Sequence, residues 1–124
     1  SPIAFYIQSS NWGTQHAANI ACGTLTGLDG GGYLRFSTSP DGNTAPAERL
    51  RITATGLVGI GTTSPSASAL LDVTSTTAGF LPPRMTTAQR DAISSPAAGL
   101  MVYNTSTNKL NFYNGSAWEA VTSA

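Results

Sequence analysis

Charged side chains are scarce in this sequence. Lys plus Arg and Asp plus Glu number six each, so the formal net charge is zero and charged residues make up 10% of the chain, against about 25% in typical soluble domains. Proteins that bind nucleic acid carry a concentrated basic surface, and polybasic clusters hold proteins on anionic membranes. The composition speaks against both, and we expect no nucleic-acid partner.

The sequence also has little of the chemistry that catalysis and metal binding use. Cys22 is the only cysteine and His16 the only histidine, which excludes an internal disulfide and a multi-cysteine zinc site. A Cys–His nucleophile pair would have to be formed by these two residues, but Cys22 lies in an apolar stretch, where a cysteine usually acts as a small hydrophobe. We expect no enzyme, no cofactor and no metal, while an ion shared between chains on a symmetry axis stays open.

Strong hydrophobes are few. Leu, Ile, Val and Phe together supply 24 of the 124 residues, near the level at which a highly charged chain would be disordered. The net charge is zero, and ten aromatic residues and clear strand patterns indicate order. The shortage is resolved if part of the core is built between copies of the chain, so we expect an obligate oligomer. No apolar run approaches the ~20 residues that span a bilayer, so we expect no membrane insertion.

Residues 48–73 carry the clearest pattern in the sequence. Apolar side chains alternate there with polar residues and then with glycines, which is the period-two pattern of short strands. A glycine has no side chain, so another backbone can approach that face closely. We expect a stalk-like strand segment in which chains pack on one another, and the predicted packing residues are Leu50, Ile52, Val58, Gly59, Ile60 and Gly61.

Two stretches have an alternative reading as ligand loops, and both fail on context. The glycines at 56–61 resemble a phosphate-binding loop, but Thr62 to Pro65 follow rather than a helix whose amides could hold an anion. Residues 41–46 resemble a calcium loop but lack the third oxygen ligand and the required glycine. We interpret the glycines as packing devices.

The flanking regions also read as β-structure. Before the stalk, alternation predicts a strand over residues 3–7 and a hairpin whose arms are residues 17–28 and 33–37. After it, residues 80–84 predict a polyproline-like segment, and Thr86 with Gln89 form a capping box that starts a helix of about two turns. A three-strand meander is predicted over residues 100–121, with a type I′ turn at Asn114-Gly115 because both central positions of that turn need positive φ.

Aromatic residues of the last meander are the remaining binding candidates. Tyrosine and tryptophan rings have an apolar body and a polar edge that can contact sugar faces or partner surfaces, although a partly buried core position is the commoner role. The candidate receptor-binding residues are Tyr103, Tyr113, Asn114 and Trp118.

Two strings resemble a known family. AERLRITATGLVGIGTTSPSASALLDV is similar to a segment of bacteriophage tail fibres, and GFLPPRMTTAQRDAISSPAAGLMVYNTSTNKLNFYNGSAWEAV resembles a small module of the same proteins. The resemblance covers about the last 80 residues and implies a homotrimeric virion fibre that attaches to a bacterial surface polysaccharide or protein. No catalytic residue carries over. Many such fibres continue into a self-cleaving chaperone, and whether one was removed from this chain stays open.

These observations predict an all-β, intertwined homotrimeric fibre with one short helix. We expect a strand-rich N-terminal module over residues 1–47, a threefold stalk over 48–79 and a helix-plus-meander module over 80–124. The predicted function is host attachment by a tail-fibre fragment. A purely structural fibre connector and a polysaccharide-depolymerising tailspike are the alternatives.

Overall fold

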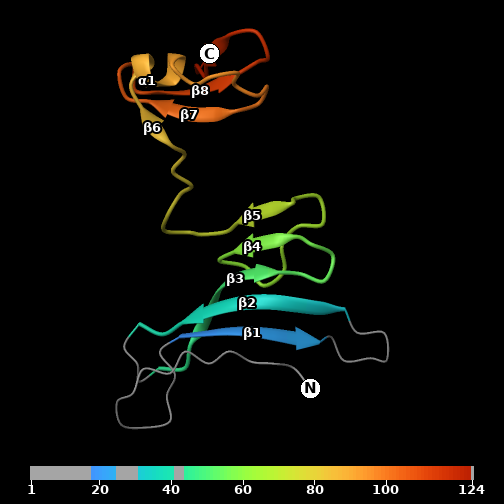
Figure 1. The fold of residues 1–124 in the computed structure, drawn as a ribbon. Coiled ribbons are helices and arrows are strands. Elements are labelled where there is room, and N and C mark those ends of the chain that lie inside the picture. Colours follow the sequence, from blue (N-terminus) through green and yellow to red (C-terminus); the bar gives the residue numbers. More distant parts are fainter. Residues whose placement is uncertain (1–17, 25–30, 41–43, 124) are drawn as a thin grey trace. The chain divides into compact units, whose positions relative to one another are not determined.

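The computed structural model describes residues 18–24, 31–40 and 44–123 (Figure 1). The chain divides into two compact units, Ser1–Ala78 (unit 1) and Gly79–Ala124 (unit 2). Each unit carries one sheet, and the described part of the chain is mostly β-structure with one short helix. The strand expected over residues 3–7 lies outside the described residues, as does His16.

Unit 1 is a five-stranded sheet with its strands in sequence order. The first four strands pair antiparallel, and the last two pair parallel through a crossover over residues 61–70. The predicted hairpin and the short strands of the organising segment are confirmed. The strands are β1 (Ala18–Thr24), β2 (Gly32–Thr38), β3 (Ala47–Ile52), β4 (Val58–Ile60) and β5 (Leu71–Val73).

The sheet of unit 1 runs across the position where we expected one module to end and the stalk to begin. Strand β3 starts at Ala47 and pairs with β2 on one side and β4 on the other. The described residues before and after position 47 therefore share one sheet and one unit.

Strand β3 contains a β-bulge. Phe36 pairs with Leu50 and Ser37 pairs with Glu48, so Arg49 has no partner on β2. A bulge of this kind places one extra residue in a strand and shifts the alternation of its side chains by one position. Glu48 and Arg51 consequently lie on the same face, although residues three apart in a regular strand point to opposite faces.

Unit 2 is a four-stranded sheet with one short helix of five residues on one side. The expected meander is confirmed as β7 (Met101–Asn104), β8 (Lys109–Tyr113) and β9 (Trp118–Ala120). A further strand, β6 (Arg84–Met85), pairs parallel with β7 where we expected only a polyproline-like segment. The carbonyl of Pro83 accepts from the amide of Tyr103 at 2.8 Å, which begins this pairing.

The helix of unit 2 starts as the sequence predicts. Thr86 is the N-cap of α1 (Thr87–Asp91), and the capping box with Gln89 is present in both directions. The helix ends at the C-cap Ala92 and is shorter than the two turns expected. None of its residues is buried.

The predicted type I′ turn is wrong. Tyr113 pairs with Trp118, so the hairpin loop has four residues between them rather than two. Gly115 has φ +101°, whereas Asn114 is not among the described residues with positive φ. The side chain of Asn114 instead accepts hydrogen bonds from the amides of Ser116 and Ala117, both at 2.8 Å, and this local side-chain bonding builds the wider loop.

Candidate functional site

Two rows of apolar side chains cross the whole sheet of unit 1. Residues that lie opposite each other on neighbouring strands point to the same face. The register therefore places ten residues on one face, which we call the apolar face. One row is Cys22, Leu34, Ile52, Val58 and Leu71, and the other is Ile20, Phe36, Leu50, Ile60 and Val73.

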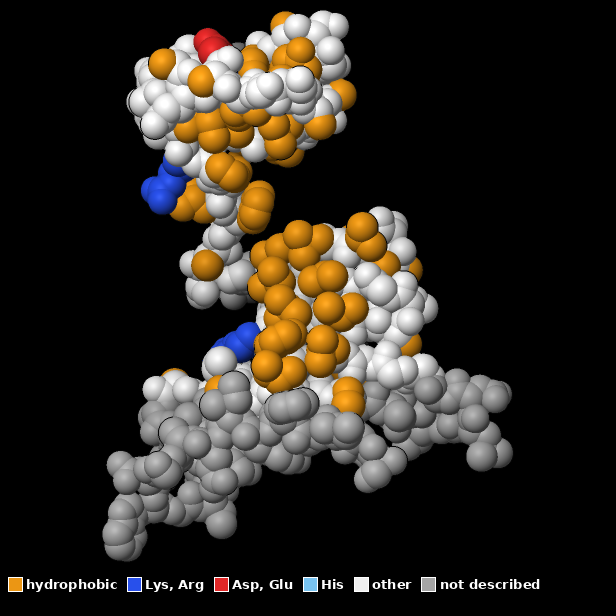
Figure 2. All heavy atoms as spheres, viewed as in Figure 1, with side chains coloured by type: hydrophobic (Ala, Val, Ile, Leu, Met, Phe, Trp, Pro, Cys, Tyr) orange, Lys and Arg blue, Asp and Glu red, His pale blue; other side chains and the backbone are white. Residues whose placement is uncertain are grey.

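The apolar face is open to solvent in the single chain. Exposed fractions of its side chains include 37% for Phe36, 40% for Ile60 and 54% for Leu71. Figure 2 shows hydrophobic side chains gathered in one continuous area over this sheet. Contiguous apolar patches of this kind mark interaction surfaces, because a monomeric protein would bury them.

The opposite face of the same sheet is polar and covered. Tyr33, Arg35, Ser37 and Arg51 lie there with Asp72, and each is buried or half-buried. An antiparallel sheet with one face in water normally exposes its polar side and buries its apolar side. Unit 1 does the reverse, so it is shaped for a partner that covers the apolar face.

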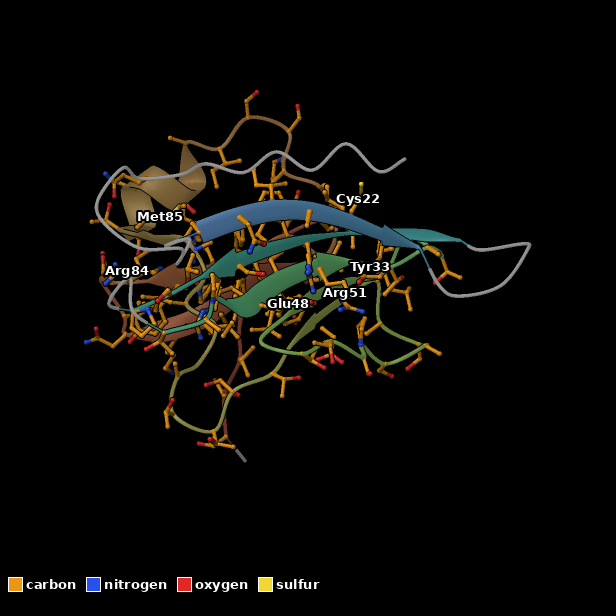
Figure 3. All side chains as sticks on the ribbon, turned by 90° about the horizontal axis from the view of Figure 1, so that it is seen from below. Cys22, Tyr33, Glu48, Arg51, Arg84 and Met85 are labelled. Atoms are coloured by element: carbon orange, nitrogen blue, oxygen red, sulfur yellow. The ribbon has the colours of Figure 1, made fainter. Side chains whose placement is uncertain are left out.

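An ion pair organises the polar face at β2 and β3. The Arg51 guanidinium donates to both carboxylate oxygens of Glu48, with Nη2 to Oε2 at 2.7 Å, and its Cζ lies 4.2 Å from the ring centroid of Tyr33. The labelled side chains of Tyr33, Glu48 and Arg51 lie together in Figure 3. The hydrogen bond that Arg51 donates to Glu48 raises the pKa of Arg51 above its usual value, so Arg51 stays charged wherever the protein is folded near neutral pH.

Gly59 in β4 and Gly61 directly after it both approach backbone of their own chain. A Cβ at Gly59 would lie 2.7 Å from the carbonyl oxygen of Thr62, and one at Gly61 would lie 2.2 Å from that of Thr74. Gly59 is on the polar face, where the crossover passes over it, and Gly61 has φ +75°. The close approach that we expected between chains is thus present within the chain.

Unit 2 brings only two of the candidate receptor-binding residues together. The rings of Tyr113 and Trp118 pack edge to face with centroids 5.4 Å apart, and both residues are half-buried. Tyr103 pairs with Leu110, which lies three residues before Tyr113 on β8. Residues three apart in a strand point to opposite faces, so the Tyr103 side chain points to the other face of the sheet. Asn114 lies in the loop and donates through Nδ2 to Glu119.

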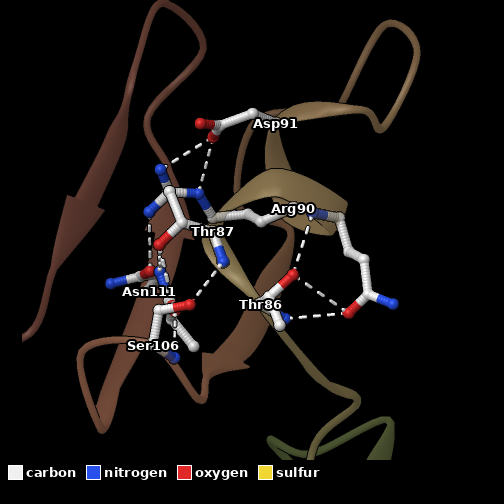
Figure 4. A network of polar contacts seen from close by, with 8 residues as sticks. Thr86, Thr87, Arg90, Asp91, Ser106 and Asn111 are labelled. Atoms are coloured by element: carbon white, nitrogen blue, oxygen red, sulfur yellow. Dashed lines mark hydrogen bonds and ion pairs between the residues drawn. The ribbon is translucent and has the colours of Figure 1, made fainter.

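A polar network between α1 and the sheet was not predicted (Figure 4). Arg90 donates through Nη1 to Oδ1 of Asn111 at 2.8 Å and also bonds Asp91, while its Cζ lies 5.6 Å from the Trp118 ring centroid. Asn104 Nδ2 donates to the hydroxyl of Thr87 at 2.9 Å. The only sequence signal was the presence of two asparagines inside the meander strands, where asparagine is disfavoured.

The residues that the structure describes give no sign of a metal centre or a membrane helix. No group of three His, Cys, Asp or Glu side chains in this part of the chain could hold an ion. Likewise, none of the described helical residues belongs to a helix of the length and hydrophobicity that crossing a membrane requires.

An exposed apolar sheet face backed by a covered polar face defines a β-structural protein that is completed by assembly. Residues 59–124, more than half of the chain, match the family described as phage tail like trimerisation region, and the chain belongs to this family. The predicted resemblance to phage tail fibres is confirmed at this level. The family is structural and indicates a homotrimer and a phage tail component. No curated protein and no solved structure matches the chain.

Proposed function

We propose that this chain is a segment of a homotrimeric phage tail fibre in which the apolar face of unit 1 is the interface between chains. The observation that carries the proposal is the pair of uninterrupted apolar rows across five strands. Four of the predicted packing residues, Leu50, Ile52, Val58 and Ile60, lie in the middle of these rows. Gly59 and Gly61 act within the chain and are left out of the interface.

Other copies of the same chain are the occupants that fit this face best. The family match begins at Gly59 in β4, so the trimerisation region includes β5 and part of β4. The apolar rows continue from these strands to β1 without a charged residue. Burying a Leu, Ile or Phe side chain fully is worth roughly 1.5–3 kcal/mol, so ten half-exposed side chains per chain supply a substantial driving force for assembly.

Ile60→Asp tests this interface because it places a charge in the middle of one row. We expect the variant to be monomeric at concentrations at which the unchanged protein is a trimer, since an unpaired carboxylate in an apolar contact is strongly unfavourable. Sedimentation equilibrium measures the mass. Thr63→Asp is the control: Thr63 is exposed in the crossover and outside the rows, so it leaves the trimer intact. A trimeric Ile60→Asp variant would refute the interface.

The finer role that we propose is attachment of the virion to a bacterial surface polysaccharide or protein. The support is the Tyr113–Trp118 pair, whose half-buried rings lie on the helix side of unit 2. Three linked copies of a weak site gain avidity of about 10² to 10⁴ without new contacts. A modest aromatic site on each chain is therefore sufficient.

Trp118→Ala is the test of attachment. We expect it to lower adsorption of the purified trimer to host cells by about tenfold or more, because loss of one aromatic contact is repeated in three copies. Lys109→Ala, an exposed change on the same sheet, is the control. Unchanged adsorption of a folded Trp118→Ala trimer rejects this site, and absence of any binding by the unchanged protein favours the structural connector. Shortening of host polysaccharide chains would favour the depolymerase.

A further inference from the structure

Unit 2 has a second apolar surface, on the side of its sheet that faces away from α1. The register places Tyr103 beside Leu110 and Met101 beside Phe112, and the amide of Val121 bonds the carbonyl of Leu110 at 2.8 Å, which extends one row. Met101 is 47% exposed and Val121 is 51% exposed. We call this surface the lower face, made up of Met101, Tyr103, Leu110, Phe112 and Val121.

Two of the three buried residues in the described part of unit 2 are polar. Its fully buried residues are Val102, Asn104 and Asn111, and the register puts all three on the side of α1. Both asparagines are used there in the network with Thr87 and Arg90. The covered side therefore holds a hydrogen-bonded network beside Val102, while Met101 and Val121 stay exposed on the open side, which a stable monomer would avoid.

Opposite charges flank the lower face at the two edges of the sheet. Arg84 on the edge strand β6 pairs with Tyr103, and Glu119 on the edge strand β9 pairs with Phe112. Within the described residues Arg84 forms no side-chain hydrogen bond or ion pair. Glu119 accepts from Asn114 through Oε1 only, which leaves its second carboxylate oxygen available.

We propose that the lower faces of three unit 2 copies pack together in the homotrimer, with Arg84 of each chain against Glu119 of the next. This inference rests on the proposed homotrimer. A second copy is the occupant because the whole of unit 2 lies inside the residues matched by the trimerisation family. A head-to-tail ring brings the β6 edge of one copy to the β9 edge of its neighbour, which pairs the two flanking charges three times.

Cysteine cross-linking tests the contact without disturbing the fold. In a Cys22→Ala background, Met101→Cys on the lower face is compared with Lys109→Cys, which the register puts on the helix side. We expect a short bismaleimide to link chains of Met101→Cys and not of Lys109→Cys. If sedimentation shows a trimer and Met101→Cys does not link, the lower-face contact is rejected while the homotrimer stands. If no trimer forms at all, the proposed function itself fails.

Charge reversal tests the flanking pair. Arg84→Glu and Glu119→Arg each place like charges together, and we expect each to raise the dissociation constant of the trimer by about tenfold at low salt. Combining the two reversals restores opposite charges and should recover most of that loss, because the coupling between them is direct. Asn114→Ala controls for the internal bond to Glu119. Additive losses in the double variant would overturn the pairing.

Discussion

At the scale of single residues, Gly59 and Gly61 are positions where the chain's own backbone leaves no room for a side chain. At both positions a Cβ would overlap a carbonyl oxygen of the crossover or of the residue that follows β5. The period-two pattern correctly indicates that these faces need a close approach, but it cannot say which backbone approaches. Only the path of the crossover, which depends on the parallel pairing of β4 with β5, decides that the neighbour is the same chain.

Gly59→Ala is therefore expected to destabilise the sheet of unit 1 directly. The added carbon must displace the Thr62 carbonyl, and overpacking of this kind costs about 1–3 kcal/mol. Thermal unfolding followed by circular dichroism measures the loss. Gly79→Ala is the matched control, because a Cβ there meets nothing within 4 Å. Loss of the trimer with unchanged melting of the sheet would instead place the close approach between chains.

At the scale of elements, alternation in the sequence predicts where the strands lie better than it predicts how they pair. The positions of β3, β4, β5 and the meander follow from period-two patterns, and the capping box predicts where α1 begins. The bulge at Arg49 leaves no such signal, because it depends on the pairing with β2. The Glu48–Arg51 ion pair could be predicted as a charge pairing, but its shared face exists only because of that bulge.

The helix of unit 2 gives a prediction of its own. Five residues are too few for a stable isolated helix, so α1 depends on its contacts with the sheet. Asn111→Ala removes the buried acceptor of Arg90 Nη1 and should lower the free energy of unfolding of unit 2 by about 1–3 kcal/mol. Urea unfolding followed by circular dichroism measures this, with the exposed Thr105→Ala as control. Equal stability of both variants would mean that the network does not hold the helix.

At the scale of the whole molecule, both units follow the same plan. Each sheet covers one face with its own chain, a crossover in unit 1 and α1 in unit 2, and each leaves apolar side chains exposed on the other face. Val102 is the only buried hydrophobic residue in the described part of the chain. The shortage of strong hydrophobes is explained if the apolar contacts are completed between chains. The composition indicates such contacts, but only the pairing of the strands shows that the apolar side chains form two defined faces.

Completion between chains makes stability depend on concentration. If assembly buries the apolar face, folding and association are linked, and the Tm must rise with chain concentration. We expect a measurable rise in Tm for the unchanged protein across a hundredfold concentration range by scanning calorimetry. The Ile60→Asp variant, whose interface carries a charge, should show a lower Tm with little dependence on concentration. A Tm that is the same at every concentration for the unchanged protein would mean that each chain completes its core alone, and both interfaces proposed for it would then lack their driving force.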